Sequence, residues 1–222
     1  MLRVGRLVVV LGAVAAMVRT GGVAGAVSAS ALVLDVSGAS IPGVRPYDEI
    51  LEDAKISLPG GARLVFLHYH TCRTVTVVGG RIRFGAETYS IIGGTKESDA
   101  RTPCPRTVTV KPGGEMAGAL IRSLGGAGLS MSSRPTFVVA GPRAADFASV
   151  RVSRGDTKVL EAPLEDRHFR WPSTAEPLAV GPEYELAFIP TTADAVPVRL
   201  KLMITPTAVE PAGEALTVIR LQ

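Results

Sequence analysis

The stretch "LHYHTC", Leu67 to Cys72, places two histidines and a cysteine at alternate positions. Imidazole nitrogens and thiolates are the ligands that zinc and copper prefer. Because side chains alternate along a β-strand, the pattern predicts that His68, His70 and Cys72 share one face. A metal ion there would need a further ligand from another element. The remaining histidine, His168, lies in a distant part of the chain.

The first residues, "MLRVGRLVVVLGAVAAMV", place Arg3 and Arg6 before an apolar run. Small residues follow at "AGA" (24–26) and "ASA" (29–31), which completes the pattern of a cleavable secretory signal. The apolar run is shorter than the roughly 20 residues that a membrane span needs. We therefore expect a signal peptide over residues 1–29 and a periplasmic or secreted product with no membrane span after cleavage.

Signal cleavage is expected between Ala26 and Ala31, and both cysteines lie beyond it. In an oxidising compartment two cysteines most often pair, which predicts a Cys72–Cys104 disulfide. Closing a loop of about 33 residues contributes roughly 3 to 4 kcal/mol in the chain-entropy account. The favoured interpretation is therefore a strand face with a disulfide at its end and neither metal nor cofactor. A metal-binding protein or metalloenzyme using His68 and His70 is the alternative.

The charge of the mature chain argues against one class of partner. The full chain has 24 Lys and Arg against 20 Asp and Glu, and removing Arg3, Arg6 and Arg19 leaves 21 against 20. A net charge of +1 provides no electrostatic footprint for a polyanion. Nucleic-acid binding is therefore not expected.

Turn residues and alternating segments predict an all-β protein. Between successive Gly pairs lie "ARLVFLHYHTCRTVTVV", "RIRFGAETYSII" and "RTVTVK", which have the composition and alternation of strands. The pairs Gly60-Gly61, Gly79-Gly80 and Gly93-Gly94 are interpreted as the turns between these strands. Short strands at regular spacing predict a small disulfide-closed β domain, an SH3-like barrel or sandwich, over residues 42–112.

The next segment is expected to separate two domains. Met116, Leu120, Ile121 and Leu124 follow helical spacing, and Gly125-Gly126 stops the pattern. We predict a short helix and flexible linker over residues 113–134.

A second β domain is expected over residues 135–222. Its short alternating segments, separated by Pro and Gly, favour an immunoglobulin-like sandwich, with Phe169 and Trp171 as core anchors.

Two further motifs have ordinary explanations. The acidic residues Asp48, Glu49, Glu52 and Asp53 are interpreted as a solvated turn, because no nucleophile or cation is adjacent to them in the sequence. "RGD", Arg154 to Asp156, lies between alternating runs and is interpreted as a hairpin turn. Nucleophile-elbow and phosphate-loop motifs are absent from the sequence, and no catalytic residue is proposed.

The layout resembles a known family. "DAKISLPGGARLVFLHYHTCRTVTVVGGRIRF" resembles the small β modules of bacterial periplasmic FecR-like proteins. "FRWPSTAEPLAVGPEYELAF" is similar to the immunoglobulin-like repeats that often accompany them. The resemblance implies an exported binding or signalling-associated scaffold and supplies no catalytic residues. We therefore expect a non-enzymatic protein that recognises an unidentified protein or envelope component through its β domains, with binding residues unknown.

Overall fold

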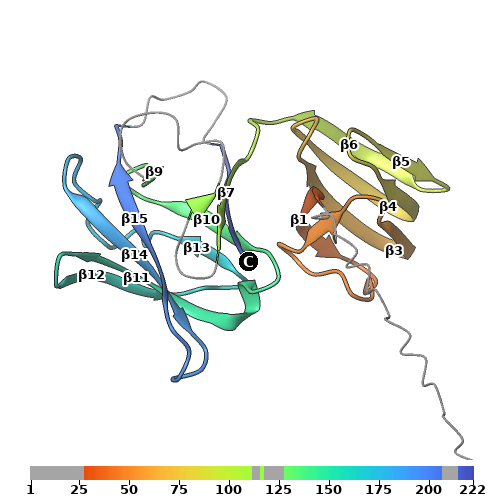
Figure 1. Ribbon diagram of the computed structural model, residues 1–222. Coiled ribbons are helices and arrows are strands. Elements are labelled where there is room, and N and C mark those ends of the chain that lie inside the picture. The colour runs from red at the N-terminus through yellow and green to blue at the C-terminus, as the bar shows by residue number, and fades with distance from the viewer. Residues whose placement is uncertain (1–27, 112–115, 118–127, 207–214) are drawn as a thin grey trace, which may run out of the picture.

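The computed structural model describes residues 28–111, 116–117, 128–206 and 215–222 (Figure 1). The predicted all-β class is confirmed. The described residues form strands β1 to β16 and one short 3-10 helix, η2 (Ala144–Asp146), and they contain no α-helix. The strands divide into two domains that each have their own core.

The first domain is one antiparallel sheet with the order β2-β1-β3-β4, in which both β5 and β6 pair with β4. Its strands are β1 (Ala29–Ser37), β2 (Glu49–Leu51), β3 (Lys55–His68), β4 (Arg73–Phe84), β5 (Tyr89–Ile92) and β6 (Thr95–Arg101). The long strands β3 and β4 bend, so the sheet curls around its apolar side as an open half-barrel (Figure 1).

The glycine pairs are the cause of this bend, and their predicted role as turns between strands is wrong for two of them. Gly60-Gly61 lies inside β3 and Gly79-Gly80 inside β4, while Gly93-Gly94 separates β5 from β6. Strand pairing places the three glycine pairs side by side. Leu58, which precedes Gly60-Gly61 in β3, pairs with Gly80 in β4. A β-carbon on Gly80 would in turn collide with the Gly94 backbone. Glycine permits such close backbone approach and the sharp bend that accompanies it.

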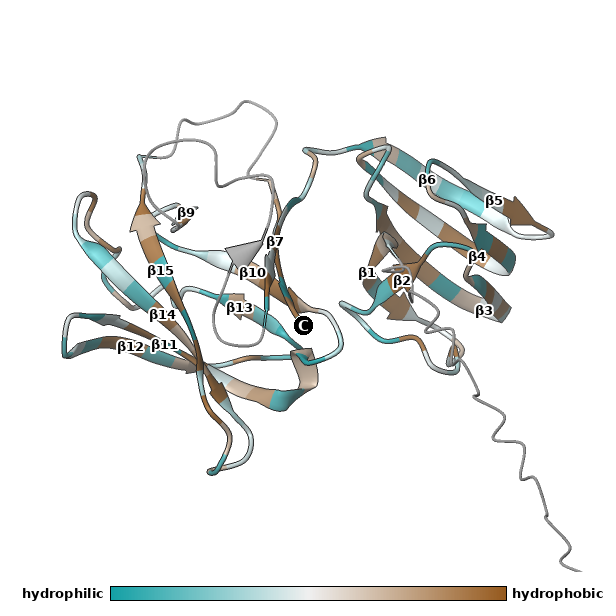
Figure 2. Ribbon diagram, viewed as in Figure 1, coloured by the Kyte–Doolittle hydropathy of each residue, from teal (hydrophilic) through white to brown (hydrophobic). Residues whose placement is uncertain are grey.

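Alternation within the bent strands builds the first core. Apolar residues alternate with polar ones along β3 and β4 (Figure 2). The rings of Phe66 and Phe84 lie edge to face at 5.0 Å between centroids, and Tyr89 covers Phe66 at 5.2 Å. Burial of these aromatic surfaces on one side of the sheet is the main source of this domain's stability.

The second domain is a sandwich of two sheets. One sheet has the order β13-β10-β16-β7-β8 and the other β12-β11-β14-β15-β9. The strands of the first sheet are β7 (Arg106–Val110), β8 (Met116–Ala117), β10 (Thr136–Ala140), β13 (His168–Arg170) and β16 (Thr217–Leu221). Those of the second are β9 (Leu129–Met131), β11 (Phe147–Arg154), β12 (Thr157–Pro163), β14 (Glu183–Pro190) and β15 (Val198–Ile204).

Strand pairing in the sandwich includes parallel neighbours. β16 is parallel to both β10 and β7, and β15 is parallel to β9. Two packed sheets are confirmed, whereas the immunoglobulin-like connectivity stays a prediction.

The two sheets of the sandwich enclose one core, in which Phe169 and Trp171 are 1% and 4% exposed, as predicted. Phe137 stacks on Phe169 at 4.8 Å, and the Trp171 indole N–H donates to the Glu176 carbonyl at 3.1 Å.

Sheet membership places the domain boundary earlier than the sequence predicted. Strand β1, which precedes residue 42, belongs to the first sheet, and β7 belongs to the sandwich because it pairs with β16. The chain therefore crosses between domains at residues 102–105, instead of 113–134. A short helix was predicted in residues 113–134. Met116 and Ala117 instead form β8, and the other residues of the predicted helical pattern, Leu120, Ile121 and Leu124, lie outside the described residues.

Candidate functional site

The strand that carries "LHYHTC" ends earlier than its alternation suggested. β3 ends at His68, and Tyr69–Cys72 is a turn in which the Cys72 N–H donates to the His68 carbonyl at 3.0 Å. Cys72 adopts a left-handed conformation with φ of 52°, and His70 is exposed. The prediction that His68, His70 and Cys72 share a strand face is therefore wrong, because the chain reverses direction within the motif.

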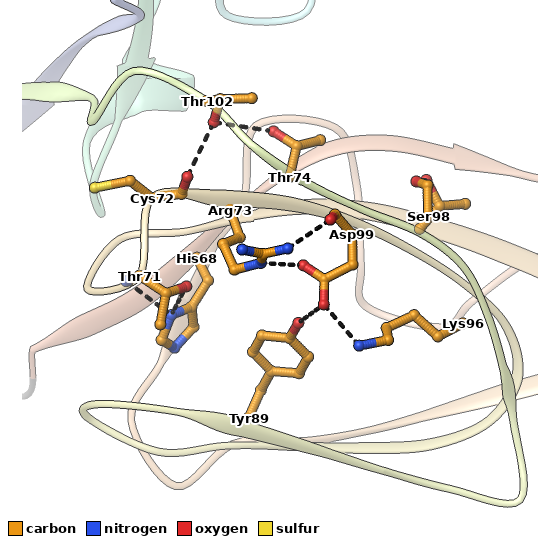
Figure 3. Close-up of polar contacts among 11 residues, drawn as sticks. His68, Thr71, Cys72, Arg73, Thr74, Tyr89, Lys96, Ser98, Asp99 and Thr102 are labelled. Atoms are coloured by element: carbon orange, nitrogen blue, oxygen red, sulfur yellow. Dashed lines mark hydrogen bonds and ion pairs between the residues drawn. The ribbon is translucent and has the colours of Figure 1, made fainter.

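The His68 imidazole is fully buried, with 0% exposure. The Ser30 hydroxyl donates to the Gly85 carbonyl at 2.6 Å, so at 3.3 Å it accepts from the Nε2–H of His68. Nδ1 then accepts from the Thr71 hydroxyl at 3.0 Å and from the Thr71 N–H at 3.4 Å (Figure 3). Burial lowers the pKa of His68, which keeps the ring neutral, and the Gly85 carbonyl offsets this only in part.

These bonds leave the metal alternative without a geometric basis. Both ring nitrogens of His68 have protein partners, and His70 points to solvent from the turn. His168 lies in the other domain against Tyr47, at 5.4 Å between ring centroids. Within the described part of the chain, no three His, Cys, Asp or Glu side chains are grouped as a metal ion would require.

The predicted Cys72–Cys104 disulfide is present. It joins the β3–β4 turn to the segment that crosses into the second domain. The Thr102 N–H donates to the Cys72 carbonyl at 2.9 Å beside it. The Thr102 hydroxyl donates to the same carbonyl at 3.4 Å (Figure 3). The bridge therefore fixes the point at which the chain leaves the first domain.

A charged cluster lies on the same sheet and was not recognised in the sequence. Asp99 on β6 accepts from Arg73 on β4, from Lys96 at 2.6 Å and from the Tyr89 hydroxyl at 3.2 Å (Figure 3). The bonds from Lys96 and Arg73 lower the pKa of Asp99 to about 2, and burial and Asp99 raise that of Tyr89 to about 12. The cluster ties both β5 and β6 to β4, so we assign it a structural role.

The junction between the domains contains an ion pair that was not predicted from the sequence. Glu49 was interpreted as part of a solvated turn, but its side chain is 9% exposed. Arg220 on β16 donates from Nε to both carboxylate oxygens, at 2.9 and 3.0 Å, and from Nη2 at 2.5 Å. The Tyr69 hydroxyl donates to the same carboxylate at 3.0 Å, and burial and Glu49 raise the pKa of this phenol. The interpretation is wrong for Glu49 because its cation arrives from the other domain.

A second ion pair reinforces this junction. Arg167 donates from Nη2 to the Pro46 carbonyl at 2.6 Å and contacts Asp48 at 2.9 Å. Asp48 therefore also departs from the predicted solvated turn, whereas Asp53 is exposed as predicted. Around these pairs lies an apolar layer made of Leu32 from the first domain and Val138, Ala140 and Val218 from the second. Apolar burial, the bidentate Glu49–Arg220 pair and the single Arg167–Asp48 contact join the two domains at this junction.

Backbone strain concentrates at the same junction. Tyr47, Asp166 and Arg167 all have positive φ, of 64°, 48° and 66°. Such conformations cost on the order of 1 to 3 kcal/mol each for residues other than glycine, and they cluster where function fixes the backbone.

A cleft of about 810 Å³ opens beside these strained loops and is lined by both domains. The first domain contributes Arg45, Pro46 and Asp48, and the second contributes Phe147, Leu164 and Asp166. A second hollow of about 540 Å³ lies in the first domain and shares Asp48 with the cleft. The described residues that line the interdomain cleft include no serine, cysteine or histidine, so its chemistry is that of binding by mixed charge and apolar contact.

Comparisons with known proteins found no matching family model, curated protein or solved structure. No helix among the described residues is long and apolar enough to cross a membrane. The fold and the junction thus define the chain as a two-domain all-β protein with a disulfide at the domain crossing. The similarity to FecR-like and SH3-like modules stays a prediction.

Proposed function

We propose that this protein is an exported, non-enzymatic binding or scaffold protein of the bacterial envelope. It recognises a protein or envelope component at the cleft between its two β domains. Export is supported by the charged, apolar and small-residue order of the first 31 residues. The Cys72–Cys104 disulfide fits an oxidising compartment such as the periplasm. The relation to FecR-like and immunoglobulin-like modules belongs to this proposal and fits the alternating, turn-rich sequence.

The observation that carries the proposal is the cleft formed by both domains next to a junction that two ion pairs cross. Glu49 with Arg220 and Asp48 with Arg167 restrain one wall of the cleft relative to the other. A preformed site avoids the cost of ordering loops on binding, which otherwise reduces affinity. Asp166 and Arg167, which line the cleft, have positive φ, and Tyr47 lies in sequence between the lining residues Pro46 and Asp48. This backbone strain fits a geometry that is maintained for a partner.

Site-specific photo-cross-linking in the native envelope tests the cleft. A photoreactive residue replaces Ala145, which is exposed and lines the cleft, or Lys158, which is exposed on β12 and does not line it. The expected result is one partner captured from Ala145 and not from Lys158. Arg45→Glu, which reverses the charge of an exposed lining residue, should reduce this capture. Equal capture from both positions, or capture unaffected by Arg45→Glu, contradicts recognition at the cleft.

Elemental analysis of the purified protein tests the metal-dependent alternative. Because the His68 nitrogens are occupied by Ser30 and Thr71, zinc and copper should be well below one equivalent. A stoichiometric metal that is lost in His68→Gln would overturn the non-metal assignment.

A further inference from the structure

Two small-residue motifs, "AGA" at 24–26 and "ASA" at 29–31, each satisfy the requirement of a signal peptidase for small side chains at alternate positions. The two motifs differ in their position relative to the fold. The second motif forms the beginning of β1, whereas the first precedes every described residue. This difference decides between the two processing sites.

The residues from Ser28 to Ala31 are built into the first domain. The Ser28 carbonyl accepts from the Glu52 N–H at 3.0 Å, and the Ser30 carbonyl accepts from the Tyr69 N–H at 2.9 Å. Ala31 is 0% exposed and pairs with His68 across the ladder. Cleavage after Ala31 would remove all of these contacts.

The Ser30 side chain makes two further contacts in the first domain. Its hydroxyl, 2% exposed, accepts from the His68 ring and donates to the Gly85 carbonyl. Without it, the buried Nε2–H of His68 and the partly buried Gly85 carbonyl would lose this partner, which would destabilise the folded chain.

The positive charge of the new N-terminus also disfavours cleavage after Ala31. Cleavage after Ala31 would place an α-ammonium on Leu32, which is 0% exposed within the apolar layer between the domains. Burial of an unpaired charge is strongly unfavourable. Cleavage after Ala26 would instead place the charge on Val27, next to Ser28, which is exposed.

We infer that the precursor is processed after Ala26, so that the mature chain begins at Val27. This inference rests on the proposed export of the protein and defines the modification that accompanies it. The mature N-terminus then lies two residues before β1 and leaves the strand intact.

Intact mass and N-terminal sequencing of the full chain, expressed in a bacterial host with its own signal peptidase, test the inference. The expected product begins at Val27. In the double variant Ala24→Lys/Ala26→Lys, the amount of this product should fall at least tenfold. Ala29→Lys, which removes the first small residue of the second motif, is the control and should leave the Val27 product unchanged.

The possible failures are distinguishable. A product that begins at Ser30, as a signal peptide over residues 1–29 predicts, or at Leu32 would overturn the cleavage site and leave the export proposal intact. A product that retains Met1 in an export-competent host would overturn the export proposal itself. As a second measurement, chains that start at Val27 and at Leu32 are refolded with their disulfide formed, and their thermal unfolding is compared. The Leu32 chain should be markedly less stable, and equal midpoints would contradict the inference.

Discussion

His68 is a buried titratable group, and its surroundings predict how the protein responds to acid. Burial lowers the pKa of His68, and burial together with Arg170 lowers that of His168, below the ordinary value of about 6.5. The unfolded chain therefore binds protons more readily than the folded one below that pH. Stability should be full above about pH 6.5 and should fall as the pH decreases from there towards 5. Urea titrations at several pH values measure this dependence.

Replacement of one histidine isolates its contribution. His68→Gln removes the titrating group, so the loss of stability between pH 7 and pH 5 should become smaller. Stability at pH 7 should also fall by about 1 to 3 kcal/mol, because Ser30 and Thr71 lose well-placed partners. His70→Gln is the matched control, since His70 is exposed and its loss should leave the stability at pH 7 almost unchanged. An unchanged pH dependence in His68→Gln would refute the assignment.

Gly94, between β5 and β6, is a second position at which a single added side-chain atom should change the stability of the protein. A β-carbon on Gly94 would collide with the Gly79 backbone, which cannot move without distorting β4. Gly94→Ala should therefore destabilise the protein by at least about 2 kcal/mol, as overpacking commonly does. Gly60→Ala is the matched control, because a β-carbon there meets nothing within 4 Å and its φ is not positive. Thermal unfolding of both variants distinguishes the bend from a general glycine effect, and equal midpoints would contradict it.

At the scale of elements, the β3–β4 turn depends on a covalent link to the domain crossing. Cys72→Ser/Cys104→Ser should lower the free energy of unfolding by roughly 3 to 4 kcal/mol under oxidising conditions. The same variant should be insensitive to reductant, whereas the wild type should lose a similar amount of stability when reduced. If the double variant and the oxidised wild type unfold at the same denaturant concentration, the bridge is not a stabilising element.

Local chemistry was enough to predict several elements from the sequence. The "RGD" segment is a two-residue hairpin turn between β11 and β12, as predicted, because Arg154 pairs with Thr157 and Gly155 has a φ of 55°. Alternation identified the strand character of these segments but not where each strand ends, because "ARLVFLHYHTCRTVTVV" contains the end of β3, a turn and the start of β4. The glycine pairs were interpreted as turns because a bend inside a strand and a turn between strands use the same residue. Only the pairing across β3, β4 and β5 distinguishes them.

At the scale of the whole molecule, the Glu49–Arg220 pair should contribute to the docking of the domains. Arg220→Leu leaves the Glu49 carboxylate nearly buried without its cation, which should cost on the order of 3 kcal/mol. Glu49→Leu/Arg220→Leu should recover much of this loss, because neither charge then lacks a partner. A double-mutant cycle by chemical denaturation measures the coupling, and additive losses would contradict the assigned pairing.

The same pair explains why the junction was missed in the sequence. Glu49 and Arg220 are 171 residues apart in the sequence, and no local pattern connects them. The available signal was the arginine inside "LTVIRL", where a charge follows a run of buried apolar residues and so requires a partner. The pattern predicts that such a partner exists and cannot say which acidic residue it is. For the same reason the domain crossing was misplaced, because β7 pairs with β16 from the far end of the chain.

If the chain is exported as proposed, the central position of β16 also sets an order in which the two domains can fold. β16 lies between β10 and β7, and neither of those strands pairs with the other. A chain that crosses a membrane from its N-terminus can complete the first domain early, because β1 to β6 require nothing beyond residue 104. The sandwich must wait until residue 221 has emerged, and Arg220 then reaches Glu49 in the same step. Under the proposed export, the translocating chain would until that moment consist of a folded first domain followed by an incomplete sandwich, so the late stage of translocation would be the period in which it is most exposed to aggregation.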